Sequence, residues 1–356
     1  MAGAGLGGPL PGRIRARQGR PLPGQPDHRA GHQPPADRGG GGGDGPSRVP
    51  ERWAAPEEGE GAVSDRGRAF TILHGSDLHF GRPHTPAAAA DFLTLAHSVS
   101  PDVIALSGDF TQRAKNREYE AAATYLKRLP RVPLVVTPGN HDVPLYRLWE
   151  RAFAPFRNYR RWIADELDSE HDLGGAVVVA LNTTTPDRTI VNGNVADEQL
   201  ERAAAAFARA GNGGLRALVV HHALVGAPEG DLIAALPRAR RIVARLAEMG
   251  VELVLFGHLH RAFISVGVPS SPSTNGSGEA DSTVLLVCSG TTASDRGRGR
   301  EKGKNSCNLV RVTNDRIAVT RYLRSPSADG FRPAARDTFP RHDFAQPPSP
   351  GTAGSA

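Results

Sequence analysis

The sequence predicts an α/β protein, a four-layer α/β/β/α sandwich of two mixed β-sheets flanked by helices. Over the first two thirds of region 70–324, short β-branched runs alternate with helical patterns, which is typical of crossover units. The last third contains strand-like runs without helices between them. Five of the apolar runs end on Asp, Asn or His, and open α/β sheets place their chemistry at that edge. Two packed sheets with helices outside them accommodate these observations.

Composition divides the 356 residues into three parts. Residues 1–66 are rich in Gly, Pro, Arg and Ala without a hydrophobic period, so we expect a disordered leader. Residues 326–356 repeat this pattern with Ser, Pro and Gly, and we expect a disordered tail. Residues 67–325 can bury one substantial core, so we expect a single folded domain there.

The expected strands are short β-branched runs, and the expected helices carry apolar residues at helical spacing. The strands cover residues 70–74, 103–106, 134–137, 176–181, 215–220, 251–256, 283–288, 309–312 and 317–320. The helices cover residues 87–97, 116–128, 146–163, 197–210 and 238–249.

Six aromatic side chains recur every three or four residues in the expected helix 146–163, so on a continuous helix they share one face. They are Tyr146, Trp149, Phe153, Phe156, Tyr159 and Trp162. Packing against the domain is the favoured interpretation. A lid over an active site and a surface for a homodimer are the alternatives.

No stretch approaches the roughly 18–20 apolar residues of a membrane span, and the start lacks the apolar run of a secretory signal. We therefore expect a cytoplasmic protein without a membrane span. Cys288 and Cys307, the only cysteines, lie in apolar runs and are expected to be buried free thiols.

The net charge of +6 is concentrated near the carboxyl end, where Arg296, Arg298, Arg300, Lys302 and Lys304 follow closely. Such a cluster can attract an anionic substrate or nucleic acid. No aromatic residue is interleaved among them for base stacking, so a solvated loop is favoured and nucleic acid is not an expected partner.

Metal-type side chains follow the apolar runs in order. Asp77-Leu78-His79 comes first, and in an extended segment residues i and i+2 point the same way, so this pair could grip one cation. Gly108-Asp109 closes the second run; in isolation it would be an ordinary strand-to-helix turn.

The later runs end on more specific groups. Gly139-Asn140-His141-Asp142 delivers an amide, an imidazole and a carboxylate in succession, and His221 directly continues the next apolar strand. Gly257-His258-Leu259-His260 then repeats the i, i+2 spacing with two imidazoles. A mixed nitrogen and oxygen set without thiolates suits Mn, Fe, Zn or Co better than Ca or a structural zinc.

The order D-x-H, G-D, G-N-H-D, H and G-H-x-H resembles the calcineurin-like metallophosphoesterase family. The flanking segments 75–81 and 107–113 are similar to its bacterial branch of class III cyclic nucleotide phosphodiesterases and glycerophosphodiesterases. The resemblance implies a catalytic domain over 67–325 with two divalent metal ions. It implies Asp77, His79 and His260 at the first ion, Asn140, His221 and His258 at the second, and Asp109 between them. It also places His141 at the phosphate, where it stabilises or protonates the leaving oxygen.

Two assignments stay open from the sequence. Asp142 either orients the ring of His141 or caps the following turn. The family usually has His-His-Pro or His-x-Pro at the fourth motif, whereas this chain has His221-His222-Ala223. His221 is the favoured ligand because it matches the usual position, and His222 is the alternative.

The expected function is metal-dependent hydrolysis of a small phosphodiester by an activated hydroxide, with a 3′,5′-cyclic nucleotide such as cAMP as the favoured substrate. A glycerophosphodiester or a phosphomonoester is the alternative. A noncatalytic binding scaffold on the same fold is a more distant one, because His141 and every implied ligand are present.

Overall fold

The computed structural model describes residues 69–187, 193–211, 213–226, 235–267, 283–327 and 329–344. The leader expected over residues 1–66 lies outside the described residues, as do residues 345–356 of the expected tail.

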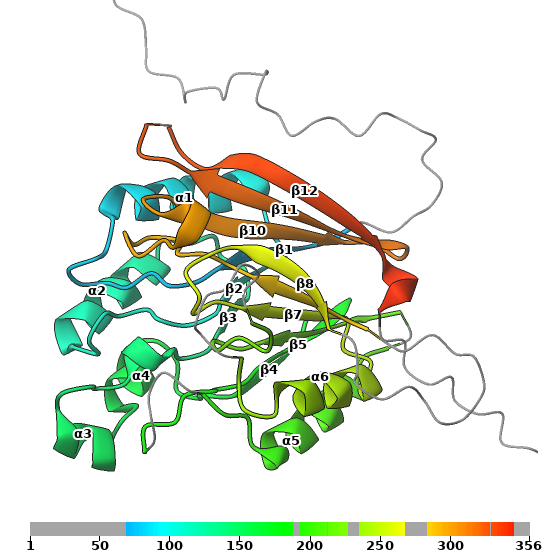
Figure 1. Ribbon diagram of the computed structural model, residues 1–356, viewed down its shortest axis with the longest axis horizontal. Coiled ribbons are helices and arrows are strands. Elements are labelled where there is room, and N and C mark those ends of the chain that lie inside the picture. Colours follow the sequence, from blue (N-terminus) through cyan, green and yellow to red (C-terminus); the bar gives the residue numbers. More distant parts are fainter. Residues whose placement is uncertain are drawn as a thin grey trace, which may run out of the picture. The chain divides into compact units, whose positions relative to one another are not determined.

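The described strands form two mixed sheets of six strands each (Figure 1). The first has the order β12-β11-β10-β1-β2-β3. Its strands are β1 (Phe70–Gly75), β2 (Val103–Leu106), β3 (Leu134–Val136), β10 (Asn305–Val312), β11 (Arg316–Arg324) and β12 (Arg332–Pro340). The strands β1, β2 and β3 are parallel, whereas β10, β11 and β12 join by antiparallel pairing.

The second sheet has the order β4-β5-β6-β7-β9-β8. Its strands are β4 (Ser169–Asp172), β5 (Ala176–Ala180), β6 (Leu215–Val219), β7 (Leu253–Phe256), β8 (Phe263–Gly267) and β9 (Val284–Cys288). The central strands β5, β6, β7 and β9 are parallel and buried along their whole length. Burial on both faces explains why they appear in the sequence as continuous apolar runs.

Alternate strand residues face different layers, which confirms the four-layer sandwich. In β1, Leu73 joins a buried cluster with Phe92 of α1 (Pro86–Val99) and Tyr119 of α2 (Asn116–Leu126). The preceding Ile72 instead joins a cluster between the two sheets. Helices α5 (Asp197–Phe207) and α6 (Ala239–Glu248) cover the outer face of the second sheet.

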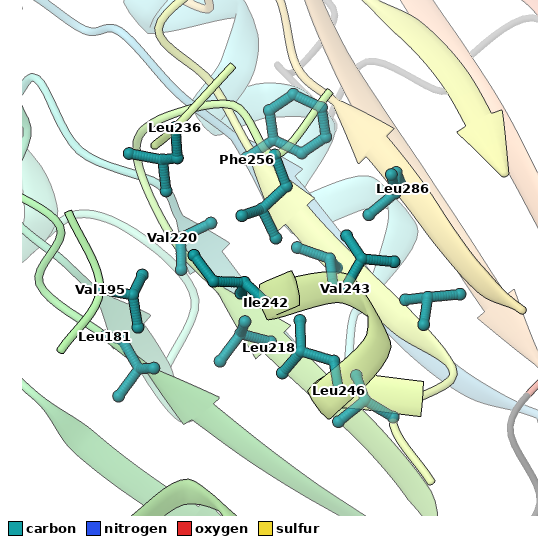
Figure 2. Close-up of a cluster of buried hydrophobic side chains, with 14 of the residues drawn as sticks. Leu181, Val195, Leu218, Val220, Leu236, Ile242, Val243, Leu246, Phe256 and Leu286 are labelled. Atoms are coloured by element: carbon teal, nitrogen blue, oxygen red, sulfur yellow. The ribbon is translucent and has the colours of Figure 1, made fainter. Parts of the chain in front are cut away.

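Figure 2 shows how α6 is held on that sheet. Ile242, Val243 and Leu246 point from the helix onto side chains of β6, β7 and β9, including Leu218 and Leu286. Ile242, Val243 and Leu246 are spaced by one and three residues, so they form a single apolar stripe. Burial of each contributes about 1.5–3 kcal/mol to stability.

Three observed strands were not expected from the sequence, and all three lie at sheet edges: β4, β8 and β12. An edge strand pairs on one side only, and natural edges are often polar. The sequences SEHD of β4 and RPAARDTFP of β12 therefore lack the apolar signal of a central strand.

The expected helix 146–163 is wrong as a single element. The chain forms α3 (Leu148–Phe153) and α4 (Arg157–Trp162), separated by a break at Pro155. Proline disfavours the helical region for the preceding residue, and Ala154 has φ −151° and ψ 54°.

The break divides the six aromatic residues. Tyr159 is buried, and Phe156 and Trp162 pack against the cluster under α2. Tyr146, Trp149 and Phe153 are 69%, 80% and 77% exposed. Packing against the domain is therefore correct for only half of the set, and the lid and homodimer alternatives stay predictions.

The disordered tail expected from residue 326 is also wrong over part of its length. Residues 332–340 form β12, and the next residue, Arg341, is buried. Its guanidinium donates two hydrogen bonds to the buried carboxylate of Glu252, at 2.8 and 2.9 Å, and another to the carbonyl of Gly213. Glu252 immediately precedes β7, so one ion pair ties the end of the first sheet to the second.

Cys288 and Cys307 are buried and free, as expected. Among the described helices, none is long and apolar enough to cross a membrane.

We expect Arg341→Ala to lower the free energy of unfolding by about 3 kcal/mol, because it leaves the Glu252 carboxylate buried without its cation. Chemical denaturation of the purified protein measures this change. The control is Arg316→Ala, which removes an arginine from the exposed pair with Asp315 and should leave the midpoint unchanged. Equal losses in both variants would contradict the role of Arg341.

Candidate metal centre

The loops that follow β1, β2, β3, β6 and β7 bring together the seven side chains implied as ligands. All seven are buried, and they come from both sheets. They are Asp77, His79, Asp109, Asn140, His221, His258 and His260. The carboxyl ends of these strands therefore share one site, as the strand pattern predicts.

The backbone at this site differs from the extended geometry expected for the D-x-H and H-x-H pairs. Asp77 and His79 have φ of 57° and 47°, and His258 and His260 have φ of 70° and 54°. This left-handed region is unfavourable for residues with a Cβ and costs about 1 kcal/mol or more per residue. Backbone hydrogen bonds from Asp77 to Gly108 and from His79 to Asp109 hold it in place.

One group of donor atoms surrounds Asp77 Oδ1. His260 Nε2 lies 3.0 Å from this oxygen and His79 Nε2 lies 3.4 Å from it, while the two ring nitrogens are 3.2 Å apart. Asp109 Oδ2 lies 3.5 Å from His79 Nε2. These four residues offer ligand atoms within 4.8 Å of one another. Asp77 Oδ1 and Asp109 Oδ2 have no hydrogen-bond partner among the described residues.

A second group forms around Asn140 Oδ1. His258 Nδ1 lies 3.0 Å and His221 Nε2 3.1 Å from this oxygen. Asp109 Oδ1 lies 3.5 Å from His221 Nε2, so the two carboxylate oxygens of Asp109 serve different groups. Asp109 Oδ1 also accepts a hydrogen bond from the backbone N–H of His141 at 2.8 Å.

The tautomer of His221 shows that the second group fits a cation. Its Nδ1 lies 2.7 Å from the carbonyl of Ser107, which can only accept, so Nδ1 carries the proton. Nε2 of the neutral ring then directs a lone pair at Asn140 Oδ1, another acceptor. Burial lowers the pKa of His221, which favours the neutral ring. These two acceptors can share a positive ion, or the N–H of His258 Nδ1, which lies 3.3 Å from His221 Nε2 and 3.0 Å from Asn140 Oδ1.

The charges at the first group lead to the same conclusion. Burial lowers the pKa of His79 well below its usual range, so this ring is neutral. Burial also opposes ionisation of Asp77, but His260 and His79 outweigh it and hold the pKa of Asp77 well below normal. Burial, reinforced by Asp77, raises the pKa of Asp109. Divalent ions would stabilise both carboxylates in the ionised form.

His141 lies at the rim of these groups rather than within them. Its ring contacts that of His79 edge-on, with centroids 4.9 Å apart. Its Nδ1 donates to the carbonyl of Gln112 at 2.9 Å, which leaves Nε2 as its second functional atom. Burial, reinforced by the cation of Arg296, lowers the pKa of His141 to about 4.

The carboxylate of Asp142 bonds to backbone groups and to Thr111 rather than to that ring, so its contacts favour the capping alternative, and a catalytic role for Asp142 stays a prediction. Its Oδ1 accepts hydrogen bonds from the N–H and hydroxyl of Thr111, and its Oδ2 accepts from the N–H groups of Phe110 and Gly139. The carboxylate therefore fastens the loop after β2 to the turn after β3, which is closer to the capping alternative. Burial raises the pKa of Asp142 to about 6 despite these hydrogen bonds.

The choice between the two adjacent histidines favours His221. His222 Nδ1 lies 2.7 Å from the hydroxyl of Thr183, so this ring nitrogen is engaged away from Asn140.

Gln112 and Arg296 belong to the site, although the sequence did not mark them. Arg296 donates to Gln112 Oε1 at 2.9 Å, and the backbone carbonyl of Gln112 orients His141. A backbone carbonyl has no residue-type signature, so nothing in the sequence could reveal that role. The basic cluster signalled Arg296 only as part of a charged loop.

Residues 70–262 match the profile of a family described as calcineurin-like phosphoesterase. A protein of Synechococcus sp. named a probable cyclic nucleotide phosphodiesterase is 30% identical over 209 residues, which cover 55% of this chain and 75% of that protein.

Two solved structures share the fold. Purple acid phosphatase PPD1 from yellow lupin (Lupinus luteus) seeds matches with a TM-score of 0.55 and 10% identity, over 82% of this chain and 58% of the lupin chain. A dimetal phosphatase from Danio rerio matches with a TM-score of 0.51 and 12% identity, over 77% of this chain and 100% of that chain. At these identities the matches show the fold alone.

We expect Asp142→Asn to lower the free energy of unfolding of EDTA-treated protein by about 1–3 kcal/mol. The amide replaces one acceptor oxygen with a donor, so at least one buried N–H loses its partner. Denaturant unfolding measures the loss, and Asp295→Asn, at an exposed carboxylate, is the control. Slower turnover without any loss of stability would instead mean that Asp142 acts on the His141 ring.

Proposed function

Because the chain belongs to the calcineurin-like phosphoesterase family, we propose that this dinuclear metallophosphoesterase is a phosphodiesterase acting on a small diester. The observation that carries the two-metal chemistry of the proposal is the carboxylate of Asp109, whose two oxygens face two separate groups of buried donor atoms, and the name of the Synechococcus protein supports the diester. A carboxylate placed in this way can bridge two cations and offset their repulsion.

The donor groups support one ligand set for each ion. Asp77, His79 and His260 would hold the first ion, and Asn140, His221 and His258 the second, with Asp109 shared. Mn, Fe, Zn and Co all suit this mixture of nitrogen and oxygen ligands. When bound, two such ions supply an activated water nucleophile and neutralise the charge on the phosphoryl oxygens.

His141 would act on the leaving group. Since Nδ1 is held by the carbonyl of Gln112, Nε2 is the atom that can face a substrate. An anionic phosphate beside it favours the charged ring, and protonated Nε2 would donate to the leaving oxygen. Gln112 is a positioning residue in this scheme, because it acts only through the ring.

A 3′,5′-cyclic nucleotide such as cAMP is the favoured substrate. The name of the Synechococcus protein supports this choice, as do the segments around Asp77 and Asp109. Glycerophosphodiesters and phosphomonoesters are the alternatives, since the donor groups themselves do not select among phosphoesters. A noncatalytic scaffold is the least favoured function, because the site retains both donor groups and His141 at its rim.

Two substitutions separate the roles at the site. Asp109→Ala should reduce bound metal from about two ions to one or fewer and lower kcat/KM for bis(p-nitrophenyl) phosphate more than about 100-fold. His141→Ala should keep its metal and lower kcat about 100- to 10,000-fold, the usual contribution of a general acid. Elemental analysis and initial rates with added Mn²⁺ measure both effects.

Glu198→Ala removes an exposed carboxylate from α5 and is the control. Equal rates in all four proteins would point to a contaminating hydrolase. Absence of turnover in the metal-loaded wild type, against bis(p-nitrophenyl) phosphate, p-nitrophenyl phosphate and cAMP, would support the scaffold function instead.

A further inference from the structure

A basic groove opens beside the metal centre. Its volume is about 1060 Å³, and it lies between the loop after β1, the start of α2 and the loop before β10. Five cationic side chains line it, against two carboxylates. The cationic residues, here called the groove cations, are Arg82, Arg113, Lys115, Arg117 and Arg296.

Within the part of the chain that the structure describes, none of the groove cations is paired with a carboxylate at ion-pair distance. Of the two acidic residues in the lining, Glu118 is buried and accepts hydrogen bonds from the backbone N–H groups of Arg113 and Lys115. Asp295 is exposed at the rim. The groove therefore carries a net positive charge that the fold leaves uncompensated.

The groove is a built feature rather than an accidental gap between loops. The N–H of Asp295 donates to the carbonyl of Pro83 at 2.9 Å, which joins two of its walls. Gly81 has φ 141°, and a Cβ there would lie 2.9 Å from Gln112 Cβ. Glycine at this position therefore permits the close contact between the loop after β1 and the loop after β2.

Gln112 and Arg296 connect the groove to His141. Gln112 lines the groove and orients His141 through its backbone carbonyl. Arg296 lines it and donates to the Gln112 side chain. A substrate whose scissile phosphate lies beside His141 would thus extend its attached group along the groove cations. Of the basic cluster 296–304, only Arg296 lines the groove.

We propose that this groove is a subsite for a second anionic group of the substrate, so that, of two otherwise identical phosphodiesters, the enzyme prefers the one that carries a further phosphate. The inference rests on the proposed phosphodiesterase function and adds a substrate class to it. An additional phosphate monoester brings nearly two negative charges, and arginines without a carboxylate partner in a concave site are suited to bind it.

Two matched substrates test the inference: the p-nitrophenyl ester of thymidine 5′-phosphate, with and without a 3′-phosphate. They share the scissile diester and the leaving group. We expect kcat/KM for the 3′-phosphorylated substrate to be at least about 10-fold higher at low salt, with the preference falling below about 3-fold in 0.5 M NaCl. Thymidine 3′,5′-bisphosphate should likewise inhibit hydrolysis of bis(p-nitrophenyl) phosphate more strongly than thymidine 5′-phosphate.

The double substitution Arg82→Gln and Arg117→Gln removes two exposed groove cations that do not contact the donor groups. It should abolish both preferences and leave the hydrolysis of bis(p-nitrophenyl) phosphate unchanged. The matched control, Arg240→Gln with Arg241→Gln, makes the same change of charge on exposed positions of α6 and should retain both preferences.

The outcomes separate the inference from the function on which it rests. Hydrolysis of bis(p-nitrophenyl) phosphate without any preference for the 3′-phosphate would overturn the subsite alone. A preference lost equally in both double variants would also overturn it, because net charge would then explain the effect. Failure of the wild type to hydrolyse any diester would overturn the phosphodiesterase function itself.

Discussion

The buried carboxylate of Asp109 is the constraint on which the rest of the site depends. It belongs to the first sheet, yet one of its oxygens faces His79 of that sheet and the other faces His221 of the second. Ionising this group in a dry interior is unfavourable without positive charge nearby. The two sheets must therefore pack so that imidazoles from both surround one carboxylate, and the resulting set of electron-pair donors is suited to cations.

The loops accept strain to reach this arrangement. Five of the seven converging residues, Asp77, His79, Asp109, His258 and His260, have positive φ, and none of them is glycine. Such conformations persist only where surrounding contacts enforce them. For Asp77, His79 and Asp109, the four hydrogen bonds to Asp142 and the backbone bonds between the loops after β1 and β2 provide those contacts. Asp142 thus holds the loop that carries Asp109 against the turn that carries Asn140. The N–H of His258 donates to Asp77 Oδ2, and the carbonyl of His260 accepts from the N–H of Arg298. The same packing leaves four of the five groove cations exposed, in a groove that Gln112 also lines.

Much of the fold could be predicted because its central strands are buried on both faces. The runs at β2, β5, β6, β7 and β9 are continuous apolar segments, and the strand expectations there agree with the structure to within one or two residues. The edges escaped prediction, since β4 and β12 depend on pairing with a neighbour rather than on their own apolar residues. The ion pair of Arg341 could not be predicted for a similar reason. Nothing in a polar tail indicates that its arginine pairs with Glu252, 89 positions earlier in the chain.

The sequence by itself determined the candidates for the site: the order of the strands that end on Asp, Asn and His, and, through the family resemblance, the expected donors, with His221 and His222 as alternatives at one position. Strand periodicity and residue type are local properties, so they can be read along the chain. Only the tertiary structure decided how the donors divide into two groups, that His221 rather than His222 faces Asn140, and that Gln112 holds His141. Those outcomes depend on side-chain directions and backbone carbonyls brought together by the packing of two sheets, and no single segment of the chain encodes them.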